Sequence, residues 1–191
     1  MKRDLIRLPK LESSFLSCEK DAERILKKLF VESNPYSKDI VKMLVVNTKD
    51  CLDNSKYDDY IKDMRLSDLV SEGYIRLTPK ISFEEHAEVK SYILISFDNF
   101  STTATNPQFR DCIVNFDILC HTDYWDIGDY RLRPLKIAGY IDGLLNNCKL
   151  TGIGTFQFLG CNELIINSDL SGYTLSFAAV HGTDDRLSDE E

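Results

Sequence analysis

Basic residues are the first thing that this sequence is short of. Among its 191 residues, 23 are Lys or Arg and 31 are Asp or Glu, so the formal net charge is −8. Proteins that bind nucleic acid without regard to sequence need cationic side chains against the phosphates. The charge therefore argues against a general DNA- or RNA-binding protein. It is compatible with a wall past which DNA slides, because a like-charged surface does not retain its cargo.

The sequence also lacks a long hydrophobic run. No segment approaches the roughly 18 consecutive apolar residues that indicate a membrane-spanning helix. The first residues, MKRDLIRLPKLESS, carry charges but no apolar stretch typical of a signal peptide. We therefore expect neither a membrane-bound nor a secreted protein. The hydrophobic fraction of 43% is nevertheless enough for an ordinary globular core.

Motifs that carry chemistry are missing as well. None of the six cysteines stands in a CxxC pair, and no Cys/His cluster has the spacing of a zinc site. There is no GxSxG nucleophile elbow and no glycine-rich phosphate loop. We favour reduced thiols over disulfides or metal, since Cys112 and Cys120 alternate with apolar residues. The sequence thus predicts no catalytic residue, no cofactor and no metal.

What the sequence does contain is a strand, a tight acidic corner and an amphipathic helix between Asp111 and Asn147. Five apolar side chains alternate along the strand and predict one buried face: Cys112, Val114, Phe116, Ile118 and Cys120. The helix carries an apolar stripe at helical spacing: Pro134, Ile137, Ala138, Ile141, Leu144 and Leu145. Face and stripe are of the right size to bury each other, so this unit predicts the core.

The remaining chain divides into three parts. Residues 1–17 form an apolar N-terminal arm that covers either its own domain or a neighbour, and both alternatives stay open. Residues 18–181 form a single domain, in which 47–85 is insertion-like. Residues 182–191 are acidic and are expected to be disordered. Two helices, at 18–31 and 37–46, open the domain, the second beginning at Ser37.

Paired strands supply the rest of the pattern. Val89–Phe97 and the strand of the central unit predict a long hairpin with a polar tip. Two short strands around Gly160 and a last strand at 173–181 close the sheet. The expected fold class is α+β: a mainly antiparallel sheet with a long hairpin, packed by one central helix and by N-terminal helices.

Three local patterns suggest chemistry, each with a plainer interpretation. His121, Asp123, Asp126 and Asp129 offer metal-type ligands, but we favour turn formation, with Asp129 as the N-cap of the next helix. Glu88-Val89-Lys90 resembles the ExK triplet of metal-dependent nucleases, so a nuclease-like enzyme using Glu88, Lys90 and the acidic corner is an alternative. Leu66–Ile95 allows a winged-helix regulatory protein, although RLSDLVSEG is poorly basic for a DNA-facing helix.

The order of elements resembles the tail-terminator and tail-completion proteins of bacteriophages, which act at the neck or head–tail connector. The resemblance spans about residues 18–181 and is carried by RDCIVNFDILCHTDYWDIGDYRLRPLKIAGYIDGLLN and by SGYTLSFAAVH. It implies a non-catalytic virion protein, assembled in the host cytoplasm as a hexameric or dodecameric ring. Its partners would be further copies and other neck, connector and tail proteins. DNA would be only passing cargo, and no membrane would be involved.

A ring needs subunit contacts and a channel wall, and the sequence offers candidates for both. The apolar and aromatic candidates for the oligomer interface are Ile93, Ile95, Phe97, Phe100, Phe109, Tyr124 and Trp125. The acidic candidates for the channel are Asp98, Asp111, Asp123 and Asp126. The hairpin loop Phe100–Arg110 has few apolar residues of its own, so we expect it to make contacts between subunits.

Overall fold

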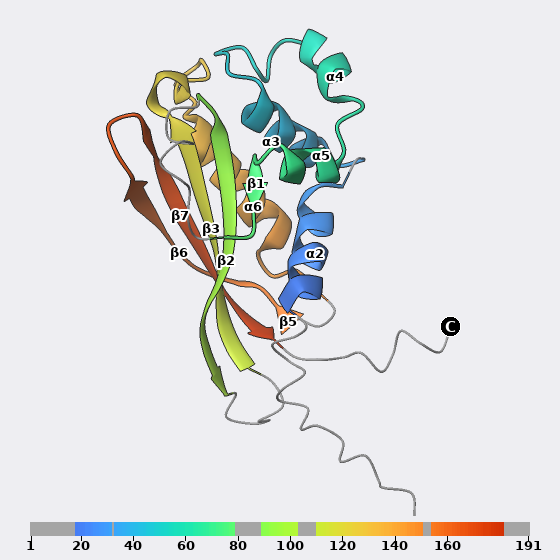
Figure 1. The fold of residues 1–191 in the computed structure, drawn as a ribbon, viewed down its shortest axis with the longest axis vertical. Coiled ribbons are helices and arrows are strands. Elements are labelled where there is room, and N and C mark those ends of the chain that lie inside the picture. The colour runs from blue at the N-terminus through green and yellow to red at the C-terminus, as the bar shows by residue number, and fades with distance from the viewer. Residues whose placement is uncertain (1–17, 32, 79–88, 103–109, 151–153, 182–191) are drawn as a thin grey trace, which may run out of the picture.

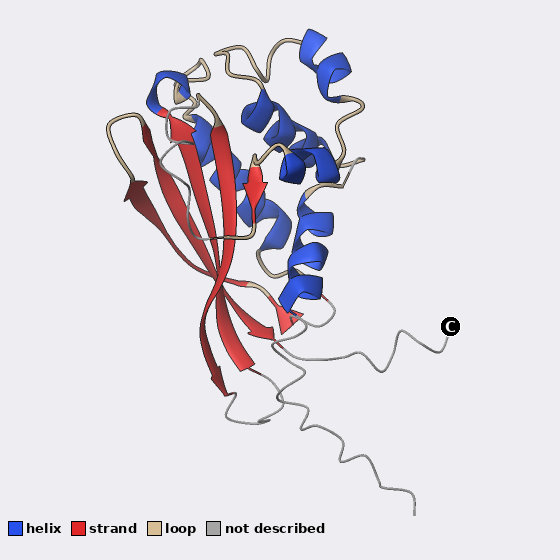
Figure 2. Ribbon diagram, in the orientation of Figure 1, coloured by secondary structure: helices blue, strands red, loops and turns tan. Residues whose placement is uncertain are grey.

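Alternating apolar residues build a sheet that is covered on one face by helices (Figures 1 and 2). A computed structural model describes residues 18–31, 33–78, 89–102, 110–150 and 154–181. The five-stranded sheet has the order β1 (Ile75–Arg76), β2 (Ser91–Thr102), β3 (Arg110–His121), β7 (Leu170–His181) and β6 (Gln157–Ile165). Its neighbours are antiparallel except β1 and β2, which are parallel. The structure confirms the predicted α+β class.

The helices lie on one side of this sheet. They are α2 (Cys18–Leu29), α3 (Pro35–Val45), α4 (Lys56–Ile61), α5 (Leu66–Ser71), the 3-10 turn η2 (Thr122–Tyr124) and α6 (Arg133–Leu145). A separate two-stranded ladder joins β4 (Lys149–Leu150) to β5 (Gly154–Thr155). Within the described ranges, none of these helices has the length and apolar character needed to cross a bilayer.

The core forms between α6 and the centre of the sheet, as the sequence predicts. The alternating face of β3 is buried from Cys112 to Cys120, and Ile137 and Ile141 of α6 are fully buried in the same cluster. Phe116 and Phe156 each pack edge-on against Phe177 of β7. α6 packs against β3 and β7 and leaves β6 at the margin of its cover.

The N-terminal helices differ in detail from the prediction. α3 begins at Pro35 and not at Ser37, because Asn34 caps it and accepts a hydrogen bond from the Tyr36 N–H at 2.9 Å. The Ser37 hydroxyl instead donates to the carbonyl of Leu29 at 2.6 Å and ties α3 to α2.

Three further expectations are wrong. Asp129 does not cap α6, since it lies in a left-handed conformation (φ 50°) and Leu132 occupies the N-cap. The strands around Gly160 are one strand, β6, with a register shift between Phe158 and Gly160. The winged-helix alternative fails because a wing is an antiparallel hairpin, whereas β1 and β2 are parallel.

The arm (1–17), the acidic tail (182–191), Glu88 of the ExK triplet and most of the hairpin loop lie outside the described residues. Lys90 is described, and its Nζ lies 5.6 Å from the centre of the Tyr74 ring.

Candidate subunit interface and channel surface

The predicted interface residues do not share one environment. Ile93 and Ile95 are 0% and 1% exposed and belong to the core, so assigning them to a subunit interface was wrong. Phe97 and Phe100 are half-buried and pack against that core, and Phe109 lies outside the described residues. The physical reason is that β2 is covered on both faces along its first half. Alternation in a sequence identifies residues that share a face and does not say what covers it.

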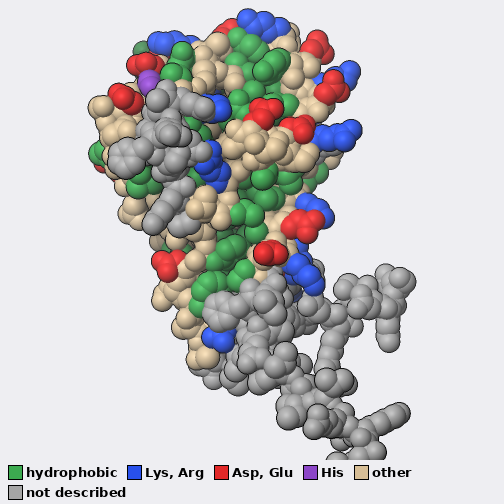
Figure 3. Space-filling view, in the orientation of Figure 1, with side chains coloured by type: hydrophobic (Ala, Val, Ile, Leu, Met, Phe, Trp, Pro, Cys, Tyr) green, Lys and Arg blue, Asp and Glu red, His purple; other side chains and the backbone are tan. Residues whose placement is uncertain are grey.

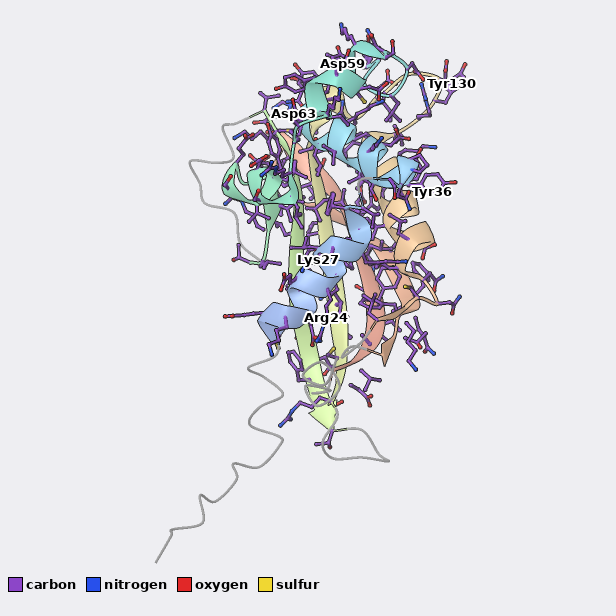
Figure 4. The ribbon with its side chains drawn as sticks, turned by 90° about the vertical axis from the view of Figure 1, so that its right-hand side faces the viewer. Arg24, Lys27, Tyr36, Asp59, Asp63 and Tyr130 are labelled. Atoms are coloured by element: carbon purple, nitrogen blue, oxygen red, sulfur yellow. The ribbon has the colours of Figure 1, made fainter. Side chains whose placement is uncertain are left out.

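Tyr124 and Trp125 are also held within the chain. The Trp125 indole N–H donates to the carbonyl of Cys120 at 3.2 Å, and its ring lies 6.2 Å from that of Tyr173. The exposed aromatic residue of this region is Tyr130, which is 104% exposed, has φ 61° and projects into solvent (Figure 4). Sequence reasoning missed Tyr130, because only its unusual backbone turns it outward.

The acidic corner (residues 121–132) is fastened by ion pairs to the loop that follows α3. Lys49 Nζ lies 2.9 Å from Asp126, and Arg131 pairs with Asp53. The hydrogen bond from Lys49 is the main reason that the pKa of Asp126 is lowered, and Arg131 lowers the pKa of Asp53 in the same way. These carboxylates are therefore committed to cations. The described part of the chain gathers no group of three His, Cys, Asp or Glu side chains suited to a metal ion.

Arg133 is the residue that organises this corner, and sequence reasoning did not single it out. Its guanidinium is fully buried and donates to the carbonyls of Tyr124, Met43, Val46 and Thr48. Two of these carbonyls come from the end of α3, where the helix dipole favours a cation. An arginine at the start of a helix after an acidic loop was the only available signal.

The face of the sheet that points away from the helices is called here the outer face. Its half near the corner is buried, with Tyr92, Leu94, Leu119 and Leu170 only 1% to 3% exposed, so the candidate channel surface is the half near the distal end of the hairpin. Asp98 of β2 and Asp111 of β3 are exposed on it, near the distal end of the hairpin. Asp117 and Asn115 accept hydrogen bonds from Thr174 at 2.6 Å and Ser176 at 2.7 Å. Among the described residues, the basic side chain with the strand parity of this face is Arg76 of β1, which lies 5.9 Å from the centre of the Tyr92 ring near the corner, and β2, β3, β6 and β7 contribute none.

The four acidic channel candidates thus fall into two pairs. Asp98 and Asp111 lie together near the start of β3, whereas Asp123 and Asp126 follow its end. Twelve residues of extended strand separate the pairs by roughly 35 Å. The outer face brings together only the first pair, and the second pair belongs to the corner.

The helical side has a different charge pattern and its own concavity. Arg24 and Lys27 project from α2, whereas Asp59 and Asp63 lie at the α4 end (Figure 4). The face shown in Figure 3 carries a band of hydrophobic side chains with acidic and basic groups beside it. A cleft of about 580 Å³ lies among α3, α4, α5 and the residues that follow α2, with Phe30, Val41 and Leu69 in its lining.

β6 differs from the other strands because one of its edges and several of its apolar side chains are exposed. β6 is an edge strand, and its large apolar side chains are exposed: Phe158 46%, Leu159 54% and Ile165 66%. It carries one charged residue, Glu163, and no proline. Natural edge strands are usually blunted by charges, proline or a covering segment, because bare edges pair with other chains. No residue of β6 was among the predicted interface residues.

These features define an α+β protein with a long hairpin, an acidic outer face and an open strand edge. Residues 37–179, three quarters of the chain, match the YomW family, so the chain belongs to that family. The family is phage-derived and SPBeta prophage-like. A search of curated proteins found no match.

Proposed function

We propose that this protein is a structural component of the phage particle that forms a ring at the head–tail junction. It would terminate or join the tail and leave a channel for DNA. The observation that carries the proposal is the β2–β3 hairpin, whose twelve-residue strands extend past the helices at one end of the body (Figure 1). A hairpin that reaches beyond its own core offers an extended surface to a neighbouring subunit.

The family supports a phage setting, and the architecture supports the finer role. The order of hairpin, single crossing helix and closing hairpin is the one on which the resemblance to tail-terminator and tail-completion proteins depends. The ring would contain further copies of this chain, a hexamer or dodecamer, stacked between other neck and tail proteins. Its location would be the virion.

The outer face suits a channel wall. DNA that passes through a ring must not be held, and each phosphate paired with Lys or Arg strengthens binding. Asp98, Asp111 and Asp117 lie on the outer face with neutral amide and hydroxyl groups between them. A wall of this kind repels the DNA backbone weakly along its length, with no site at which the cargo would stop.

The proposal assigns no reaction to the protein. In the corner, where an enzyme would need free carboxylates, Asp126 pairs with Lys49, and Arg131 of the corner pairs with Asp53 of the facing loop. We expect purified protein to leave DNA intact with Mg²⁺ or Mn²⁺ present. Cleavage that disappears in Glu88→Ala or Lys90→Ala would instead establish the nuclease-like alternative.

Electron cryo-microscopy of assembled particles tests the proposal. We expect a symmetric ring of this chain at the neck, with the outer face or the hairpin toward the lumen and no belt of Lys and Arg around it. A protein absent from purified particles, or a channel lined mainly by Lys and Arg, would contradict the proposal.

A further inference from the structure

The open edge of β6 presents main-chain groups that a strand from another chain can reach. The main-chain groups of β6 alternate in direction, and one hydrogen bond fixes the phase. The Ile166 N–H donates to the carbonyl of Leu170, so the paired residues Ile165 and Ser171 do not bond each other. By the period of two, Leu164 and Asn162 turn their main-chain groups toward β7. Cys161, Glu163 and Ile165 turn theirs outward.

The surroundings of this edge are apolar and acidic. On the helix side of the strand, Ile165 is exposed and Glu163 carries a carboxylate. Asp142 of α6 lies close enough to Cys161 to help raise the pKa of that thiol, after the larger effect of burial. One carboxylate oxygen of Asp142 is buried and makes no hydrogen bond. An occupant of this edge would therefore combine apolar side chains with positive charge.

The N-terminal arm has this composition. Residues 1–17 contain seven large apolar residues including Met1, four basic residues and two acidic residues, so their charge from side chains is +2. Residues 18–191 therefore carry −10, which together with the +2 of the arm gives the net charge of −8. Opposite charges favour docking of the arm on the body, whereas two bodies repel each other. Fully extended, 17 residues span roughly 55 Å, which is enough to cross to an adjacent subunit.

Proline 9 decides how the arm would pair. Proline has no N–H, so in an added strand it must face away from the partner. Asp4, Ile6, Leu8 and Lys10 would then direct their main-chain groups toward β6, and Arg7 would direct its own to solvent. The added strand itself becomes the new edge, and a proline there protects it from further pairing.

We propose that the N-terminal arm of one copy adds as a strand to the β6 edge of the next copy. This contact is head-to-tail, since the arm and the edge are different surfaces, and such contacts close into rings when the rotation permits. Main-chain pairing supplies affinity, and the apolar side chains of both strands supply specificity. The inference rests on the proposed ring and names the contact that would build it.

The test uses two pairs of full-length variants. Leu8→Pro removes an N–H that faces β6, whereas Arg7→Pro removes one that faces solvent. Glu163→Pro removes an outward N–H of β6, whereas Glu163→Gln keeps the N–H and removes the charge. Sedimentation velocity over a concentration series, with thermal melting by circular dichroism to verify folding, gives the dissociation constant of each.

We expect Leu8→Pro and Glu163→Pro to be folded and to raise the dissociation constant at least about tenfold, the effect of losing one main-chain hydrogen bond. Arg7→Pro and Glu163→Gln should stay within a few-fold of the wild type. A wild-type chain that remains monomeric at every concentration, or a folded Glu163→Pro variant that assembles normally, would overturn the inference.

Mixing the two impaired variants gives the decisive measurement. The Leu8→Pro chain keeps an intact β6, and the Glu163→Pro chain keeps an intact arm. One productive contact of wild-type strength therefore remains, and the mixture should form dimers at concentrations at which each variant alone is mainly monomeric. Dimers absent from the mixture would overturn the head-to-tail contact. Leu8→Pro assembling like the wild type would instead indicate pairing between two β6 edges.

The two proposals can fail separately. Particles that show a ring, together with variants that assemble normally, would leave the neck role standing and remove the arm from its interface. Particles without a ring would end the neck role, and the solution measurements would still report whether the arm joins two copies.

Discussion

The acidic corner and the β6 edge are two exposed regions of the same domain. Polar groups of the corner are paired within the chain, whereas main-chain groups of the β6 edge point away from the sheet. In the corner, Asp126 pairs with Lys49 and Arg133 binds four main-chain carbonyls. Along β6, Cys161, Glu163 and Ile165 turn main-chain groups away from β7, and the large apolar side chains of the strand are 46% to 66% exposed at Phe158, Leu159 and Ile165. Exposed charge therefore marks a region that is internally tied. Exposed backbone marks the region at which we propose a partner.

Helix α6 lies between these two regions. The largest expected change in stability comes from placing a charge on its buried side, with its exposed side as the comparison. Ile141 is 0% exposed above the sheet, whereas Leu135 is 42% exposed on the margin. Ile141→Asp should unfold the domain, because an unpaired buried carboxylate costs several kcal/mol, out of a total stability of about 5–15 kcal/mol. Leu135→Asp should melt close to the wild type. Thermal melting of both variants checks this, and a natively melting Ile141→Asp would contradict the packing.

The second largest loss of stability is expected in the corner, on substitution of Arg133. Replacing it by Met keeps much of the volume but leaves buried carbonyls without donors, so we expect a loss of about 3 kcal/mol or more in the free energy of unfolding. Arg131→Met removes an exposed ion pair with Asp53 and should change the stability little. Urea unfolding of the two variants measures the difference. Equal midpoints would show that Arg133 does not hold the corner.

The same contrast explains what the sequence predicted and what it did not. The face from Cys112 to Cys120 and the stripe of α6 were predictable, because alternation and helical spacing leave a strong local signal. The parallel pairing of β1 with β2 and the buried state of Ile93 depend on segments distant in sequence. Arg133 satisfies carbonyls some 85 to 90 residues away. No local pattern carries that information.

The candidate site was predicted less well than the fold. Asp98 and Asp111 share the outer face, but Asp123 and Asp126 lie at the other end of β3. The β6 edge was missed because the sequence around Gly160 predicts two short strands. A register shift lets the chain continue as one strand of nine residues. Edge position follows from strand order, which a single sequence does not reveal.

The direction of the β6 main chain can be tested without any assembly. Asn162→Pro removes an N–H that faces β7 and should lower the stability of the monomer by at least about 2 kcal/mol, since the ladder loses a bond and the ring crowds its neighbour. Glu163→Pro removes an outward N–H and should melt near the wild type. Dilute samples, in which association is negligible, provide the comparison by thermal melting. A larger loss in Glu163→Pro than in Asn162→Pro would reverse the assigned phase.

The smallest expected effect is on the alkylation of the thiols. Cys161 at the β6 edge and Cys120 in the core provide the comparison. Burial raises the pKa of Cys120 to about 11, whereas Cys161 is exposed and its pKa is raised by partial burial and by Asp142. Alkylation proceeds through the thiolate, so at pH 8 Cys161 should be modified in the native protein while Cys120 is protected until unfolding.

Asp142→Asn tests whether that carboxylate faces the edge. Removing its negative charge lowers the raised pKa of Cys161, increases the thiolate fraction at pH 8 and should speed alkylation by up to about threefold. Asp169→Asn, in the turn between β6 and β7, is the matched control and should leave the rate unchanged. Peptide mass spectrometry resolves Cys161 from the half-buried Cys18 and Cys148. An unchanged rate in Asp142→Asn would place its charge away from β6. The arm's positive charge would then have to find its complement in Glu163 alone.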